Sequence, residues 1–185
     1  MTVAYPPFSA DGQEVRWTTW DGEHDEVATL RWENEGWTIS GVVSRERIQY
    51  AIRATATWRV SQLLLFRDLE EPDLWLATDG SGRWGEMNGA HRPDLDGCYD
   101  VHLACTPLTT ILPIRRIVLH EGDTAELPIV TIDPETLEVR PGRHRYTRAA
   151  SHRWIVTHPG SEPVEFEVDE HGLAIDLPEQ FRRVR

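Results

Sequence analysis

Apolar and polar residues alternate along the chain from position 47 to position 60. Because successive side chains of a β-strand point to opposite faces, this period of two indicates a strand with one apolar and one mainly polar face. The apolar face consists of Ile48, Tyr50, Ile52, Ala54, Ala56, Trp58 and Val60. We expect one long strand here, bent at its small residues.

Shorter segments with the same pattern follow one another through most of the sequence, separated by turn signals such as Asp21-Gly22. The further strands expected are 14–20, 26–32, 37–43, 61–66, 74–78, 83–87, 127–132, 137–139, 143–148, 152–157, 164–168 and 173–177. No segment shows a helical period. Turns spaced by about 8 to 12 residues are typical of an antiparallel sandwich or barrel.

These strands predict an all-β fold in which residues 1–185 form a single domain. A chain of this length can bury a substantial core. Because exposed sheet edges invite aggregation, we expect a highly curved antiparallel sheet that forms a barrel or half-barrel with a concave trough.

The charge of the chain argues against two classes of partner. It has 31 acidic and 19 basic residues, a net charge of -12 and no lysine. Such an acidic surface is repelled by nucleic acid and by anionic bilayers. No signal-peptide pattern and no apolar run of transmembrane length occur, so we predict a soluble, cytoplasmic protein without an integral membrane segment.

The two cysteines and eight histidines do not form a recognisable reactive motif. Cys98 and Cys105 lie on opposite faces if one strand passes through both, which argues against a disulfide. The cysteine spacing is not that of a zinc site, and the chain has no G-x-S-x-G or H-E-x-x-H motif. We predict no metal site, no cofactor and no catalytic residue.

The segment from Gly97 to Leu119, GCYDVHLACTPLTTILPIRRIVL, contains the best candidates for a binding site. Its alternation predicts two strands joined by a corner, with Asp100 and His102 on one face of the first strand. Arg115 and Arg116 then point to opposite sides of the second strand. One of these arginines faces inward and needs an anionic partner, for which Asp100 is the nearest candidate in sequence.

This segment also carries a resemblance. GCYDVHL followed by TPLTTILPIRRIVLHEG resembles the central signature of a glycolipid-binding family of bacterial proteins. The similarity continues through VRWTTWDGEHDEVATL, RHRYTRAASHRWIV and EFEVDEHGLAIDLPEQFRRV. The resemblance implies a curved half-barrel similar to those of bacterial lipoprotein carriers, and a glycolipid as the ligand.

We therefore predict a non-enzymatic binding protein for an amphiphilic small molecule. Apolar side chains of the trough would receive its lipid-like part, and polar side chains would fix its head group. The polar residues expected in this role are Asp100, His102, Thr109, Thr110 and one of Arg115 or Arg116. The sequence supports no prediction of the oligomeric state.

Three further residues are candidate ligand contacts. Trp84 follows a glycine-rich turn among small polar residues, whereas Trp37 and Trp58 are expected in the core. Tyr146 is flanked by arginines and would place its hydroxyl at the rim. Arg53 belongs to an evenly spaced row of three arginines that faces either solvent or the trough.

Two other functional hypotheses stay open. Asp100 and His102 also suit the centre of a hydrolase acting on a sugar or phosphate ester. With His144 or His152 from a neighbouring strand, the same pair would suit a divalent metal. A purely structural explanation of Asp100 and His102 is a buried polar pair joined to an inward arginine, without any activity.

The second functional hypothesis is a scaffold, in which the curved sheet binds another protein.

Overall fold

The structure, a computed structural model, describes residues 5–68 and 70–184 and consists mainly of β-strands. The predicted all-β, strongly curved fold is confirmed. The prediction of one domain over residues 1–185 includes residues 1–4, 69 and 185, which lie outside the described residues. That prediction remains untested.

The larger sheet has nine strands in the order β13-β14-β1-β2-β3-β4-β5-β6-β7, and all neighbours are antiparallel. Its strands are β1 (Gln13–Thr19), β2 (Asp25–Glu33), β3 (Gly36–Val43), β4 (Ile48–Thr55), β5 (Val60–Arg67), β6 (Leu74–Thr78), β7 (Trp84–Glu86), β13 (Asp176–Leu177) and β14 (Phe181–Arg183). Consecutive strands are joined by tight turns over most of this sheet, as the turn signals predicted.

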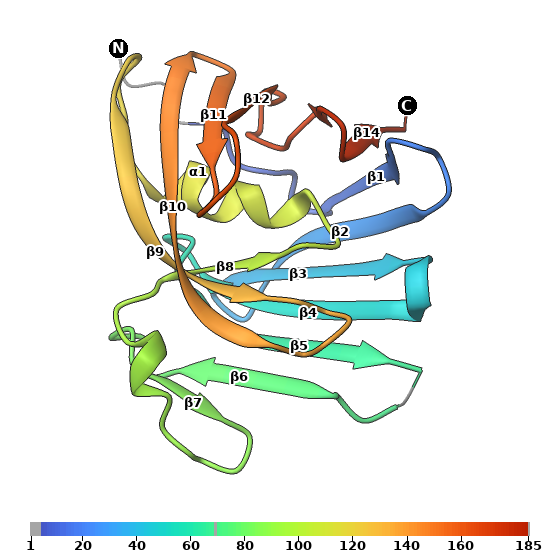
Figure 1. Cartoon of the computed structure of the whole chain (residues 1–185), viewed down its shortest axis with the longest axis vertical. Coiled ribbons are helices and arrows are strands. Elements are labelled where there is room, and N and C mark those ends of the chain that lie inside the picture. Colours follow the sequence, from blue (N-terminus) through green and yellow to red (C-terminus); the bar gives the residue numbers. More distant parts are fainter. Residues whose placement is uncertain (1–4, 69, 185) are drawn as a thin grey trace.

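The smaller sheet has five strands in the order β12-β11-β10-β9-β8. They are β8 (Asp100–Leu103), β9 (Thr124–Ile132), β10 (Val139–Ala150), β11 (Arg153–Thr157) and β12 (Val164–Glu167). The pair β8 and β9 is parallel, which differs from the antiparallel arrangement expected throughout. In Figure 1, β9 and β10 run down the view and curve, while β2 to β6 run across it.

The segment after β8 is helical, which corrects the prediction of a corner and a second strand. It forms the 3-10 helix η3 (Leu108–Thr110) and the helix α1 (Ile111–Arg116). Two further 3-10 helices are η1 (Arg45–Arg47) and η2 (Pro93–Leu95). Because β8 and β9 are parallel, the chain between them must cross back to the starting end, and such crossovers are usually helical.

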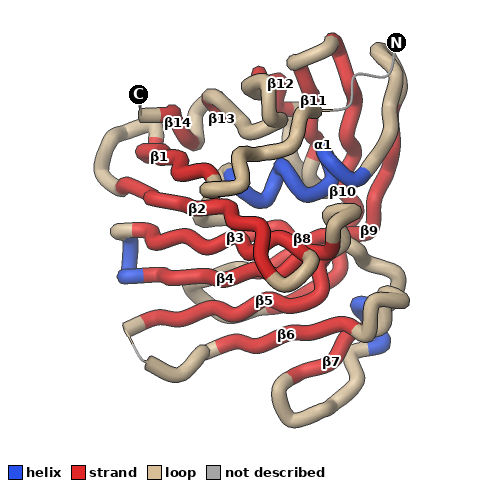
Figure 2. Tube along the Cα trace, turned by 180° about the vertical axis from the view of Figure 1, so that it is seen from behind, coloured by secondary structure: helices blue, strands red, loops and turns tan. Residues whose placement is uncertain are grey.

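The helix changes the expected directions of the two arginines. Arg115 and Arg116 diverge by about 100° around α1 and do not point to opposite faces of a strand. The apolar residues Ile111, Leu112 and Ile114 are buried, so the short helix is held by packing. Figure 2 shows α1 between the strands β1 and β2 on one side and β9 to β11 on the other.

The single strand predicted over 47–60 is instead two strands, β4 and β5, joined by a turn. The alternation holds through β4, where the even-numbered residues are buried. At Trp58 the backbone has a φ of 65°, in the left-handed region, and the chain reverses. The small residues of this segment therefore mark the end of a strand and not a bend within it.

One cluster of buried apolar side chains joins the larger sheet to β8 and α1. It includes Leu30, Ile39, Ile52, Leu63, Leu76, Leu103, Ile111 and Leu112. A second cluster lies around Tyr146, Trp154 and Phe166. The chain's own side chains thus fill much of the space between the sheets, and the pockets described below lie near turns and strand ends. Among the described residues, no helix has the length and apolar character needed to cross a membrane.

Candidate functional site

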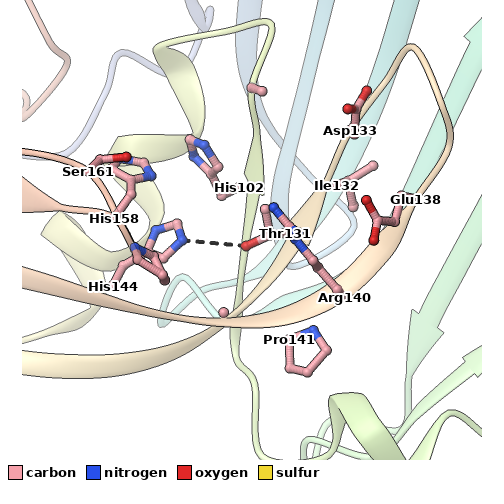
Figure 3. A pocket seen from close by; sticks show the side chains of 13 residues that line it. His102, Thr131, Ile132, Asp133, Glu138, Arg140, Pro141, His144, His158 and Ser161 are labelled. Carbon is pink, nitrogen blue, oxygen red and sulfur yellow. Dashed lines mark hydrogen bonds between the residues drawn. The ribbon is translucent and has the colours of Figure 1, made fainter.

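Two pockets of the described structure contain side chains suited to binding. The first, called here the histidine pocket, has a volume of about 470 Å³ and is shown in Figure 3. It is lined by His102, Ala104, Thr131, Ile132, Asp133, Glu138, Arg140, Pro141, Gly142, His144, His158, Pro159 and Ser161.

Three imidazole rings form one side of the histidine pocket. The ring centroid of His102 lies 5.0 Å from that of His144 and 4.6 Å from that of His158. The centroids of His144 and His158 are 4.4 Å apart. Burial lowers the pKa of all three histidines, that of His144 to about 4. The rings are therefore neutral at neutral pH.

Gly142 gives His144 the room it occupies. A Cβ at Gly142 would lie 2.7 Å from Thr131 Oγ1 and 3.3 Å from His144 Nε2. These two atoms are themselves 3.4 Å apart, a weak hydrogen bond that is dashed in Figure 3. A larger residue at position 142 would therefore displace the Thr131 hydroxyl and press against the imidazole.

The second pocket, called here the aromatic groove, has a volume of about 410 Å³. It is lined by Pro7, Phe8, Ser9, Ala10, Trp32, Trp37, Ala56, Trp58 and Arg115. Since none of these residues lines the histidine pocket, the two pockets are separate.

The β2–β3 and β4–β5 turns position the aromatic rings of the groove. Trp32 and Trp37 are cross-strand partners on either side of the β2–β3 turn, with ring centroids 5.2 Å apart. Trp37 stacks on Trp58 at 5.1 Å with an interplanar angle of 20°. Phe8 meets the edge of Trp37 at 5.5 Å. Trp37 and Trp58 are largely buried, as expected, whereas Trp32 is 46% exposed.

Arg115 places a positive charge against these rings. Its Cζ lies 4.7 Å from the ring centroid of Trp58 and 5.0 Å from that of Phe8. The guanidinium donates to the carbonyls of Tyr5, Pro6 and His171, and within the described chain it forms no ion pair. Burial lowers the pKa of Arg115 to about 10, which leaves it charged at neutral pH.

Asp100 and Arg116 form a buried ion pair and line neither pocket. The inward arginine and its carboxylate partner were thus correctly expected, but the carboxylate is turned to α1 and away from a ligand space. In the described structure the carboxylate of Asp100 bonds to Arg116, and no hydrogen bond joins it to His102.

Thr109 and Thr110 are buried, and their hydroxyl groups form local hydrogen bonds. Thr109 Oγ1 accepts from the backbone N–H of Leu103, and Thr110 Oγ1 donates to the carbonyl of Pro107. Both hydroxyls stabilise the turn that leads into α1. Neither lines the histidine pocket or the aromatic groove.

The other three predicted contacts also lie outside both pockets. Trp84, expected to be exposed, is 1% exposed and donates from Nε1 to the carbonyl of Cys98 at 3.0 Å. Tyr146, expected at a rim, is buried, and this burial raises its pKa far above the usual range. Arg53 donates to Thr38 Oγ1 and to the carbonyl of Glu33 on the outer face of the larger sheet.

Of the nine predicted site residues, His102 lines the histidine pocket and Arg115 lines the aromatic groove. Phe8, Trp32 and His158 were not among the predicted site residues. Trp32 had a usable signal, because tryptophans on both sides of a tight hairpin turn become cross-strand neighbours. His158 had none, since its approach to His102 depends on how the strands cross in three dimensions.

Comparison with known proteins gives one family. The family described as "Putative glycolipid-binding" matches residues 14–183. Among solved structures, a DUF1089 family protein from Pseudomonas aeruginosa is similar, with a TM-score of 0.74, 29% sequence identity and coverage of 86% of this chain and 92% of that chain. No curated protein matches the chain. Because the family match extends over residues 14–183, nearly the whole sequence, the chain belongs to the "Putative glycolipid-binding" family.

Proposed function

We propose that the protein binds an amphiphile, with a glycolipid as the favoured example, in the aromatic groove and without catalysing a reaction. The observation that carries this proposal is the meeting of three tryptophans, Phe8 and a guanidinium around one open apolar space. The family description supports a binding role, and the aromatic rings with the guanidinium support the groove as the proposed location.

The groove suits a ligand with an apolar face. Its volume of about 410 Å³ falls in the range of about 300–1,000 Å³ that is usual for small-molecule sites. Tryptophan rings stack on the apolar face of a sugar or pack against an acyl chain. Trp32 has the most exposed ring among the three tryptophans of the groove, so it is the first ring that a ligand would contact.

Arg115 suits the polar end of such a ligand. Its hydrogen bonds all go to backbone carbonyls, and the nearby carboxylate of Asp169 acts on it only through space while forming its own ion pair with Arg183. A guanidinium can donate hydrogen bonds to a phosphate, a carboxylate or sugar hydroxyls. We therefore infer that Arg115 favours an amphiphile with a polar or anionic head group.

The backbone at Trp58 supports a role in binding. A bulky residue with a φ of 65° is unusual, and such a conformation costs on the order of 1–3 kcal/mol. Strained positions cluster at binding sites because the strain fixes a side chain where function requires it. Here it holds the Trp58 indole between Trp37 and the guanidinium of Arg115.

The test is a titration of the full chain with an alkyl glucoside and with an alkyl phosphate of the same chain length, followed by calorimetry. Trp32→Ala should weaken binding of the better ligand by about tenfold, since an aromatic contact contributes about 0.5–1.5 kcal/mol beyond its buried area. The matched control is Trp75→Ala, because Trp75 is 37% exposed on β6 and lies outside the groove. Equal affinities for the two variants would contradict the groove as the binding site.

A further inference from the structure

Three imidazole rings converge in the histidine pocket although they come from distant parts of the sequence. His102 lies on β8, His144 on β10 and His158 directly after β11. One nitrogen of each ring lies within 4.8 Å of one nitrogen of each of the other two. Figure 3 shows the three rings grouped together on one side of the pocket.

Apart from His144 Nε2, which lies 3.4 Å from Thr131 Oγ1, the ring nitrogens of this cluster have no hydrogen-bond partner in the described structure. In the part of the chain that the structure describes, no hydrogen bond is made by the rings of His102 and His158. His144 is 1% exposed, and its buried Nδ1 has no hydrogen-bond partner. Because buried polar groups are nearly always paired, an unpaired nitrogen among three imidazoles indicates a site for a ligand.

We propose that His102, His144 and His158 bind a divalent transition metal ion, and specifically Zn²⁺. Imidazole nitrogens suit Zn²⁺, whereas Mg²⁺ and Ca²⁺ prefer oxygen ligands. Three protein ligands leave one coordination position open, as in zinc sites that bind an exogenous group, while structural zinc sites have four protein ligands.

Binding requires the three nitrogens to move closer together. Zn–N bonds of about 2.0–2.1 Å place the nitrogens of a tetrahedral site about 3.3 Å apart. Starting from separations of at most 4.8 Å, ring rotations that move a nitrogen by about 1.5 Å are sufficient. His102 and His158 are only partly buried and can rotate, whereas the buried His144 is the fixed ligand.

The open position faces the rest of the histidine pocket. Its other walls carry two acidic side chains, Asp133 and Glu138, and one basic side chain, Arg140. The pocket volume of about 470 Å³ admits water or a small molecule with an oxygen donor to the metal. Since the pocket is separate from the aromatic groove, metal binding does not depend on the proposed amphiphile site.

The experiment is a Zn²⁺ titration of untagged full-length protein that a chelator has stripped of metal. We expect one Zn²⁺ per chain, and a Co²⁺-loaded form with the d–d absorption of a tetrahedral site. His158→Ala should lower the Zn²⁺ affinity by at least about 100-fold, because losing only a group that orients a ligand already costs about 10–100-fold. His152→Ala, which removes an exposed histidine outside the pocket, should leave the affinity unchanged.

Two results would overturn the proposal. One is the absence of stoichiometric Zn²⁺ binding by the parent protein. The other is binding that His158→Ala and His152→Ala affect equally, which would identify adventitious surface sites. Circular dichroism of the metal-free variants establishes that they are folded. If His158→Ala does not fold, His158→Gln retains a polar side chain of similar size and takes its place, with the same expected loss.

Discussion

Arg116, in the last turn of α1, holds the fully buried carboxylate of Asp100 on β8, with Nη2 and Oδ2 2.5 Å apart. Arg116 Nε donates to the same carboxylate, at 3.0 Å to Oδ1 and 3.2 Å to Oδ2. Burial raises the pKa of Asp100, and the adjacent guanidinium opposes this rise by stabilising the charged form. The pair therefore fixes the crossover helix on the smaller sheet.

Asp100→Ala is expected to lower the free energy of unfolding by about 3–5 kcal/mol, because it leaves the guanidinium of Arg116 partly buried without an anion. Urea denaturation measures this loss. Glu165→Ala is the control, because it removes one member of an exposed pair with Arg153 and should have almost no effect. A stable Asp100→Ala variant that fails to bind an amphiphile would instead return Asp100 to the binding site.

The strands could be predicted because their signal is local. The segments 37–43 and 74–78 correspond to β3 and β6 almost residue for residue, since recognisable turns bound each of them. The strand predicted over residues 111–116 was wrong, because their apolar residues fit a short helix and a strand about equally well. The helix follows from the parallel pairing of β8 and β9, which is a tertiary property.

The binding residues were harder to predict than the strands for the same reason. An inward-facing arginine needs an anionic partner, and the prediction that Asp100 is this partner was correct. The hydrogen-bond partners of Arg115 could not be inferred from local sequence. They are the carbonyls of Tyr5, Pro6 and His171, which lie near the two ends of the chain. His158, directly after β11, meets His102 on β8 through the strand order of the smaller sheet, which local sequence does not reveal.

Gly41→Ala is expected to lower the free energy of unfolding by about 1–3 kcal/mol through overpacking. Gly41 on β3 faces its cross-strand partner Tyr50 on β4, and a Cβ would lie 2.4 Å from the Tyr50 hydroxyl. The ring of Tyr50 is 1% exposed and has no room to retreat. Thermal melting compares this variant with Gly85→Ala, whose Cβ would meet nothing closer than Ala90 O at 3.4 Å. Equal losses would exclude the ring contact as the cause.

Trp84→Phe should reduce stability and leave amphiphile affinity unchanged. The Trp84 indole is buried and donates to the carbonyl of Cys98, so its replacement leaves that buried acceptor without this donor, at a cost of about 1–3 kcal/mol. Trp32→Ala should show the opposite pattern, since Trp32 is exposed in the aromatic groove. Denaturation and ligand titration on the same preparations separate the two effects. A Trp84→Phe variant of unchanged stability and weakened binding would make Trp84 a ligand contact.

Glu26 should make the stability of the protein fall as the pH rises. Its Oε1 accepts a 2.5 Å hydrogen bond from the Tyr50 hydroxyl, its Oε2 is buried without a partner, and burial raises its pKa from the usual 4.5 to about 7. The folded state therefore holds the proton more tightly than the unfolded state. The resulting contribution of Glu26 to the free energy of unfolding is complete below about pH 4.5. It decreases by roughly 3 kcal/mol as the pH rises to about 7. Glu26→Gln cannot ionise and lacks this decrease, so the free energy of unfolding of the variant, measured relative to the parent by urea denaturation, should rise across that window. A difference that stays constant with pH would mean that Glu26 has the same pKa in the folded and unfolded chains.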